Sequence, residues 1–289
     1  IAPISITIAG EVHETEPITV EVHAGAFTPR SDPEPAPGNL SVAETFFSEA
    51  EVDNPNPYIG EQIDYIFRFH SALRFVNPPR YDSPPFIGFW YEGETDSRRY
   101  ELFLNERQYG VIELRTALFP TVTGTLTIEP TRYGFPSTGF RSSRQLLTNT
   151  VRVDVRPLPS GAPAGFEGAV GQLEIDAKVD VASAAVNEPI TLTVIVSGAG
   201  NIETLPDPLL PDVAGWRSFV GPPADDTQTV DGRIVGSRSI ERIFVPTAEG
   251  EFVIPSISYS YFDPKTELYE TVSTNPISVS VTPGSVDAP

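Results

Sequence analysis

The stretch FPTVTG at residues 119–124 decides the fold class, because it returns as VPTAEG at residues 245–250, 126 residues later. The stretches TNTV at residues 148–151 and TNPI at residues 274–277 are also 126 residues apart. Earlier in the chain, EQIDY at residues 61–65 and EPITL at residues 188–192 are 127 residues apart. A spacing held to within one residue over this length indicates one domain fold used twice.

The repeated unit reads as a sequence of β-strands. Apolar side chains occupy every second position in residues 63–69, 151–155, 190–196 and 277–281. This alternation predicts half-buried antiparallel strands. The 30 prolines and 22 glycines recur between such stretches and would break helices, and no amphipathic helix is indicated. We therefore expect an all-β chain of tandem immunoglobulin-like β-sandwiches, each with roughly seven to nine strands.

Turn signals fall at matched positions in the two copies. Asp231-Gly232 lies between two strand patterns and predicts a hairpin, and residues 105–106 occupy the same place in the earlier copy. Gly124 and Gly250 stand in turns before the next strand, where a glycine with positive φ is expected.

Large side chains are matched as well. Phe89 and Trp216 each follow a glycine, and we expect both to fill a sandwich core rather than bind a ligand. Arg107 and Arg233 each follow a hairpin turn. For these two residues, pairing with a carboxylate is favoured over ligand binding.

The N-terminus contains part of a further copy. TEPITVEV at residues 15–22 repeats TNPISVSV at residues 274–281. The first residues therefore predict only the last two strands of a module, paired with each other or with another partner, and a longer natural chain before Ile1. The predicted organisation is a partial module at 1–27, a Pro-rich linker at 28–40, a second module at 41–157, a linker at 158–165, a third module at 166–283 and a tail at 284–289.

Composition excludes several classes of function. The formal net charge of −20 repels nucleic acid and anionic lipid headgroups. The chain has no cysteine, which excludes disulfides, thiolate catalysis and cysteine-bound zinc. No apolar run approaches the roughly 18 residues of a membrane span, so membrane attachment would need an anchor absent from this chain.

Four stretches in a characteristic order carry a family resemblance. They are VRPLP at residues 155–159, FEGAVG at residues 166–171, VSGAGNI at residues 196–202 and YFDP at residues 261–264. The chain resembles the BatD family, the oxygen-tolerance or aerotolerance proteins of bacteria. The resemblance implies an ectodomain of an exported, membrane-anchored protein that acts outside the cytoplasm, in the periplasm or at the cell surface. It also implies genes for von Willebrand A-domain proteins and MoxR-type ATPases nearby, and supplies no catalytic motif.

Catalytic chemistry has little support in the residues. The histidines are His13, His23 and His70, and none belongs to a nucleophile-elbow motif. The 39 acidic residues offer no spacing that singles out a carboxylate pair for hydrolysis. We predict no catalytic and no cofactor-binding residue.

Calcium is the metal that the acidic residues favour. Asp225, Asp226 and Asp231 lie in or beside the predicted hairpin loop, and calcium prefers such hard oxygen ligands. The Asp-x-Asp-x-Asp-Gly signature is missing, so a plain acidic loop remains the alternative.

The stretch Gly198-Ala199-Gly200-Asn201 could suggest a phosphate-binding loop. Neither a Lys-Ser pair nor a helix follows it, which argues against that function. Its glycines instead predict a tight bend or the close approach of the neighbouring module.

These observations predict a non-enzymatic, extracytoplasmic scaffold or interaction protein, BatD-like, in a membrane-associated complex with von Willebrand A-domain proteins. Such domains can take a carboxylate from a partner as a metal ligand, and Asp225 and Asp226 are the candidates. The alternatives are a cell-surface adhesin or carbohydrate-binding module, with an aromatic platform, and a hydrolase, with convergent carboxylates in a concave site.

Overall fold

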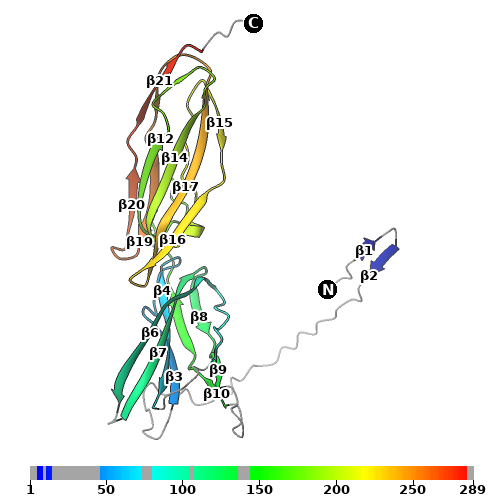
Figure 1. Cartoon of the computed structure of the whole chain (residues 1–289), viewed down its shortest axis with the longest axis vertical. Helices are drawn as coiled ribbons and strands as arrows, with labels where there is room; N and C mark the ends of the chain where they lie inside the picture. Colours follow the sequence, from blue (N-terminus) through cyan, green and yellow to red (C-terminus); the bar gives the residue numbers. More distant parts are fainter. Residues whose placement is uncertain are drawn as a thin grey trace. The chain divides into compact units, whose positions relative to one another are not determined.

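The computed structural model describes residues 5–8, 11–14, 46–72, 80–104, 107–135 and 144–284. The chain divides into two compact units, residues 1–40 and residues 41–289. In the described residues every regular element is a β-strand except one 3₁₀ turn, η1 (Ile202–Thr204) (Figure 1). The prediction of an all-β fold is confirmed.

The first unit contains a hairpin of β1 (Ser5–Ile8) and β2 (Glu11–Glu14), in which Ser5 lies opposite Glu14. This hairpin lies before residues 15–22, so the prediction that residues 1–22 form the last two strands of a module stays a prediction. The strand predicted at residues 15–22 and the linker at residues 28–40 lie outside the described residues.

In the second module a four-stranded antiparallel sheet packs against two smaller sheets. The large sheet has the order β3-β4-β7-β6, built from β3 (Phe46–Val52), β4 (Ile63–Ser71), β7 (Arg107–Pro120) and β6 (Phe89–Leu104). The smaller sheets are β11 (Val151–Val155) with β8 (Gly124–Ile128), and β10 (Arg144–Leu147) with β9 (Arg132–Phe135) and β5 (Arg80–Tyr81). Tyr65, Phe69 and Leu118 of the large sheet meet Ile128 and Val153 in one buried core. Two layers around one core make this module a β-sandwich.

The third module repeats this arrangement. Its large sheet has the order β12-β14-β17-β15, with β16 also paired to β17, and contains β12 (Gly171–Val179), β14 (Ile190–Gly200), β15 (Trp216–Val220), β16 (Ala224–Val230) and β17 (Arg233–Pro246). The facing layer contains β13 (Ser183–Ala185), β21 (Ile277–Thr282) and β18 (Gly250–Ile254), and the pair β19 (Ser258–Asp263) and β20 (Leu268–Ser273). Leu192, Val194 and Phe244 pack against Ile254 and Val279 between the layers.

The repeat read from the sequence is confirmed strand by strand. Strands β7 and β17 begin at Arg107 and Arg233 and end at Pro120 and Pro246. The predicted strand starts at Ile63 and Ile190 are also those of β4 and β14. Strand β11 ends at Val155 as predicted, and β21 ends one residue beyond Val281. The exact module limits remain predictions.

Three elements differ between the copies: β5 and β13 have no matching strand in the other module, and β6 is not matched by one continuous strand. Strand β6 runs unbroken for 16 residues, with register shifts between Glu92 and Asp96. In the third module the equivalent stretch is split into β15 and β16 by Gly221-Pro222-Pro223. Proline has no backbone N–H to donate to the ladder, so the strand is interrupted there. The third module therefore has ten strands in its described residues, one more than the seven to nine predicted.

The predicted turn geometry is confirmed. Val230 pairs with Arg233 across a two-residue loop, in which Asp231 and Gly232 have φ of 50° and 81°. Two positive φ values are those of a type I′ hairpin turn. Gly124 and Gly250 have φ of 101° and 143°, as expected. Residues 105–106 lie outside the described residues.

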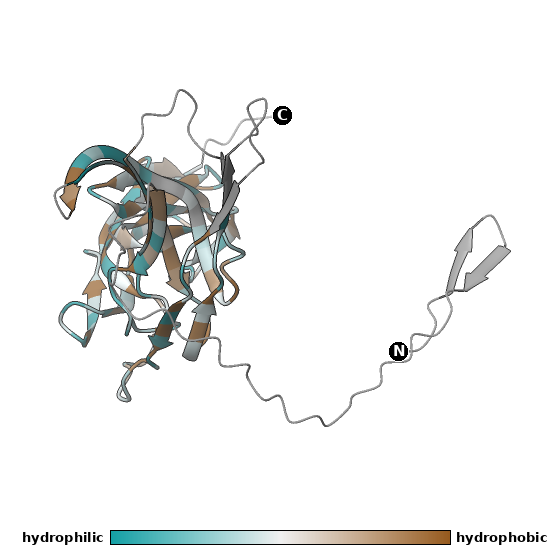
Figure 2. Ribbon diagram, turned by 90° about the horizontal axis from the view of Figure 1, so that it is seen from below, coloured by the Kyte–Doolittle hydropathy of each residue, from teal (hydrophilic) through white to brown (hydrophobic). Residues whose placement is uncertain are grey.

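The predicted half-burial is right for most strands and wrong for β4. Strands β11 and β14 bury alternate residues over most of their length. Figure 2 shows hydrophobic and hydrophilic residues following each other along strands of the sandwiches. In β4 eight of nine residues are buried, because its second face is covered by polar side chains and by contacts with the third module. Phe89 and Trp216 pack in the two cores, which confirms that prediction.

Candidate functional site

The acidic residues singled out in the sequence are not gathered in a loop. Asp225 and Asp226 lie in strand β16, and only Asp231 stands in the turn. The prediction of an acidic loop is therefore wrong for the first two, because the strand pattern extends back to Ala224 by pairing with Ser239. Neighbouring residues of a strand point to opposite faces, so these two carboxylates do not converge.

Asp225 already has a cationic partner. Both of its carboxylate oxygens accept hydrogen bonds from Arg238 Nη1, at 3.0 and 2.9 Å, and Arg238 Nε donates to Asp207 at 2.8 Å. Burial works against the charge of Arg238, but the hydrogen bond with Asp207 and the two acidic charges outweigh it and raise its pKa. Asp226 and Asp231 are exposed.

The part of the chain that the structure describes contains no group of three or more histidine, aspartate or glutamate residues that could hold a metal ion. Asp225, Asp226 and Asp231 thus do not form a ready calcium site. Of the histidines, His13 lies in β2 and His23 lies outside the described residues. His70 is buried at the end of β4, where it stacks on Phe47 and contacts Glu49 at 3.1 Å.

The glycines of the 198–201 stretch serve strand packing within the third module. A Cβ on Gly198 would lie 2.0 Å from the carbonyl oxygen of Gln172, and one on Gly171 would lie 2.2 Å from that of Ala199. Both clashes are between β12 and β14. The expected approach of the neighbouring module is therefore wrong at this stretch, and the neighbour is a strand of the same module.

The main interaction site that the structure reveals is the junction between the second and third modules. One half of it is a hydrophobic cluster of Tyr58, Val170 and Phe262, with Leu158, Phe166 and Tyr269 packed around it. Tyr58 and Phe262 meet edge to face with ring centroids 4.8 Å apart. The guanidinium of Arg156 lies 3.8 Å from the centre of the Tyr58 ring and 3.4 Å from a carboxylate oxygen of Glu267.

The other half is the tip of the β16–β17 hairpin, which docks on the outer face of β4 and β7. Ile234 is buried against Ala117 and Phe119, with Trp90 beside them. The Gln62 side chain clamps the tip, because its Nε2 donates to the Gly232 carbonyl at 2.8 Å and its Oε1 accepts from the Ile234 N–H at 2.9 Å. Paired backbone groups and a buried apolar residue together fix the hairpin in place.

Charged groups surround this clamp. Arg233 donates to the Gln62 carbonyl at 3.1 Å and lies 3.7 Å from Asp53, which confirms the predicted pairing of Arg233 with a carboxylate. Asp64 is buried beside Gly232. Burial raises the pKa of Asp64, and the charge of Asp53 adds to this, while Gln62, Arg233 and Arg115 oppose it.

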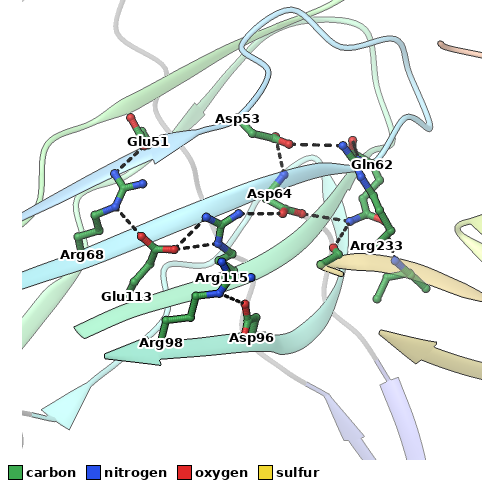
Figure 3. A network of polar contacts seen from close by, with 12 residues as sticks. Glu51, Asp53, Gln62, Asp64, Arg68, Asp96, Arg98, Glu113, Arg115 and Arg233 are labelled. Atoms are coloured by element: carbon green, nitrogen blue, oxygen red, sulfur yellow. Dashed lines mark hydrogen bonds and ion pairs between the residues drawn. The ribbon is translucent and has the colours of Figure 1, made fainter. Parts of the chain in front are cut away.

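The polar contacts continue from the junction along the outer face of the sheet (Figure 3). Arg115 lies 3.7 Å from Asp64 and 2.9 Å from Glu113, and Arg68 Nε donates to Glu113 at 2.7 Å. Burial disfavours the charge on Glu113, but the hydrogen bonds from Arg68 and Arg115 outweigh it and lower its pKa. Arg68 also pairs with Glu51 at 2.6 Å. This network explains why the outer face of β4 is buried although it carries charged residues.

Most of the junction was missed by the sequence reasoning. Its key residues stand where the copies differ, since Gln62 corresponds to Pro189 and Ile234 to Gln108. A comparison that looks for identical residues in the two copies passes over these positions. A comparison that looks for differences between the copies would have pointed to the junction.

The comparisons with known proteins bear on the third module. Residues 177–281 match the family model described as BatD DUF11 like domain. The third module matches the BatD family. The resemblance drawn from the sequence is thereby confirmed for this part of the chain, and the second module repeats the same fold. A comparison with curated protein sequences found no match.

A comparison with solved structures found bacterial proteins that are similar to this chain at low identity and low TM-score. The Yersinia pseudotuberculosis adhesin InvE is 13% identical over 80% of this chain, with a TM-score of 0.24, and the Escherichia coli adhesin FdeC is 14% identical over 83%, with a TM-score of 0.21. The C-terminal domain of the Streptococcus pyogenes antigen I/II-family protein AspA is 5% identical over 82% of this chain and all of its own, with a TM-score of 0.23. This chain spans 58% of InvE and 65% of FdeC.

No helix in the described residues has both the length and the apolar content to cross a membrane.

Proposed function

We propose that this chain is a non-enzymatic, extracytoplasmic interaction protein of the BatD type, which presents two joined sandwiches to protein partners in a membrane-associated complex. The observation that carries the proposal is the BatD domain match at residues 177–281, placed in a chain whose second module repeats that domain and docks on it. A junction with a buried clamp suits a rigid scaffold more than a flexible linker, because it fixes the spacing of the surfaces on either side.

The partner that the resemblance suggests is a von Willebrand A-domain protein, recognised through an exposed carboxylate. The contacts of Asp225 and Asp226 differ, and this difference bears on which of the two is the better candidate for the metal ligand. Asp225 is neutralised by Arg238, whereas Asp226 on the neighbouring position of β16 is exposed. We therefore assign the metal-ligand role in this proposal to Asp226, with the exposed Asp231 as the second choice.

The test is binding of the purified chain to the A-domain protein encoded beside it, measured with and without magnesium. Asp226→Asn should weaken magnesium-dependent binding by about tenfold or more, since a metal–carboxylate contact would be lost. Raising the salt concentration should slow association, because exposed charges are screened. Glu174→Gln, which removes an exposed charge on β12, is the matched control and should leave binding unchanged. Binding indifferent to magnesium and to Asp226→Asn together with Asp231→Asn rejects the carboxylate mechanism.

A further inference from the structure

The junction between the modules uses one hairpin and one sheet face, and the repeat supplies each module with both. The β16–β17 hairpin of the third module occupies the outer face of β4 and β7 in the second module. The equivalent hairpin of the second module is β6–β7, and the equivalent face of the third module is that of β14 and β17. Neither this second hairpin tip nor this second face belongs to the junction described above, so one further pair of matching surfaces is left.

The face of the third module has the character of a docking surface. Ile243 corresponds to Ala117 and Val245 to Phe119 in the repeat. Ala117 and Phe119 are 0% and 1% exposed under the hairpin, but Ile243 is 41% exposed. Phe219 lies directly opposite Ile243 across β15 and β17 and is 64% exposed. Phe219 and Ile243 therefore form an exposed apolar pair at the position where the hairpin covers Ala117 in the second module.

The charge at the edge of this face is preserved as well. In the junction, Arg233 of the hairpin pairs with Asp53. Asp180 corresponds to Asp53, and the two make the same backbone contacts, since Asp180 Oδ1 accepts from Thr191 N at 2.8 Å and Asp53 Oδ1 accepts from Asp64 N at 2.7 Å. Asp180 is exposed. Its charge therefore stands where a docked hairpin would bring an arginine.

The hairpin of the second module carries that arginine. Arg107 begins β7 as Arg233 begins β17, and it is exposed. Phe103 on the same hairpin is 70% exposed and supplies an apolar side chain near the tip. Hairpin and face thus offer complementary charge and apolar area at the two ends of the joined modules.

We propose that the β6–β7 hairpin of one copy docks on the outer face of β14, β17 and β15 of a second copy, with Arg107 against Asp180. Hairpin and face are different surfaces, so the contact is heterologous and builds a head-to-tail array, which is a ring if the rotation between copies closes and a filament if it does not. In this array, modules of different chains would stack on each other as the two modules of one chain already do. The Gln62 clamp has no counterpart, because Pro189 stands at its position. The association is consequently weaker than the junction and depends on concentration.

The test is sedimentation velocity of the full 289-residue chain over a range of concentrations at physiological salt, where repulsion from its net charge of −20 is screened. We expect reversible self-association. Phe219→Asp with Ile243→Asp should abolish it, and Arg107→Glu or Asp180→Asn should each weaken it by about tenfold. The Asn side chain keeps the acceptor that Asp180 offers to the backbone.

The matched control is Val253→Asp with Leu268→Asp, two residues that are 56% and 61% exposed in the opposite layer. This double variant adds the same charge and should associate like the original chain. A chain that stays monomeric up to about 200 µM overturns the proposal, as does association that survives the Phe219 and Ile243 changes. Neither result depends on the A-domain partner, so the two proposals fail separately.

Discussion

At the scale of single residues, the two modules share individual side-chain hydrogen bonds as well as strands. Thr148 Oγ1 accepts from the N–H of Thr131 at 2.9 Å, and Thr274 Oγ1 accepts from the N–H of Ile257 at 3.0 Å. Glu61 and Glu188 accept from Tyr58 and Ala185, each at 2.8 Å. Each carboxylate or hydroxyl satisfies a backbone donor that leaves the ladder at a turn. The repeated polar residues are therefore structural.

The buried threonine contact is open to a direct test. Thr274→Val keeps the shape of the side chain but leaves the Ile257 N–H unsatisfied in the core, where Ile257 is 2% exposed. We expect a loss of about 1–3 kcal/mol in the free energy of unfolding. Chemical denaturation measures it, and Thr125→Val, which changes an exposed threonine, is the control. Equal stability of the two variants would contradict the structural role.

The buried carboxylate at the junction predicts a pH dependence. Burial raises the pKa of Asp64 above its ordinary value of 3.8, so at a pH between these two pKa values the folded state binds a proton that the unfolded state has lost. Stability from this group therefore falls as pH rises from about 4 through the raised pKa. The Asp64→Asn variant does not lose stability in this way. Its free energy of unfolding, relative to that of the original chain, should therefore increase with pH and then level off. Urea denaturation at several pH values measures the difference, and Asp154→Asn is the exposed control. A difference that shrinks with rising pH would show the opposite sign of shift.

How much of this could be predicted from sequence differs between the strands and the site. Strand starts such as Ile63 and Ile190 could be predicted because both copies must bury the same core face. The burial of the outer face of β4 could not, because it depends on Ile234 and Gln62 meeting across 172 residues. Asp225 was misplaced in a loop because nothing in its local pattern shows that Arg238 lies beside it.

At the scale of elements, the β16–β17 hairpin is both a strand pair and the docking device of the junction. Its turn conformation is fixed by Gly232, whose φ of 81° is unfavourable for residues with a side chain. A Cβ there would also lie 3.4 Å from Oδ2 of Asp64. The contact with Asp64 is an ordinary van der Waals distance, so Gly232 acts on docking through the conformation of the turn that carries Ile234.

Gly232→Ala should therefore affect the junction beyond the turn. We expect a loss of about 1–2 kcal/mol in stability from the left-handed backbone, together with faster hydrogen exchange at the Ile234 amide that Gln62 holds. Gly93→Ala is the control, since a Cβ there meets nothing within 4 Å. Unchanged exchange at Ile234 in the variant would show that the turn does not govern docking.

At the scale of the whole molecule, residues 41–289 form one compact unit because two separate contacts join the modules. The cluster of Tyr58, Val170 and Phe262 lies beside the linker, and the hairpin tip is held by Ile234 and Gln62. Two points of attachment resist both bending and twisting, whereas a linker alone would leave the modules free. A rigid pair is also what the proposed array requires, since a flexible joint would not carry a regular spacing from copy to copy.

The coupling predicts how the chain unfolds. With the junction intact, the two modules should melt in one calorimetric transition, because unfolding either one exposes the apolar surface it buries against the other. Gln62→Ala with Ile234→Ala removes the clamp and the buried apolar side chain while leaving both sandwich cores unchanged, so the single transition should separate into two. Gln228→Ala with Val230→Ala, at exposed positions of β16, is the matched control and should keep one transition. Two transitions already present in the unaltered chain would mean that each module folds independently and that the junction contributes orientation without cooperativity.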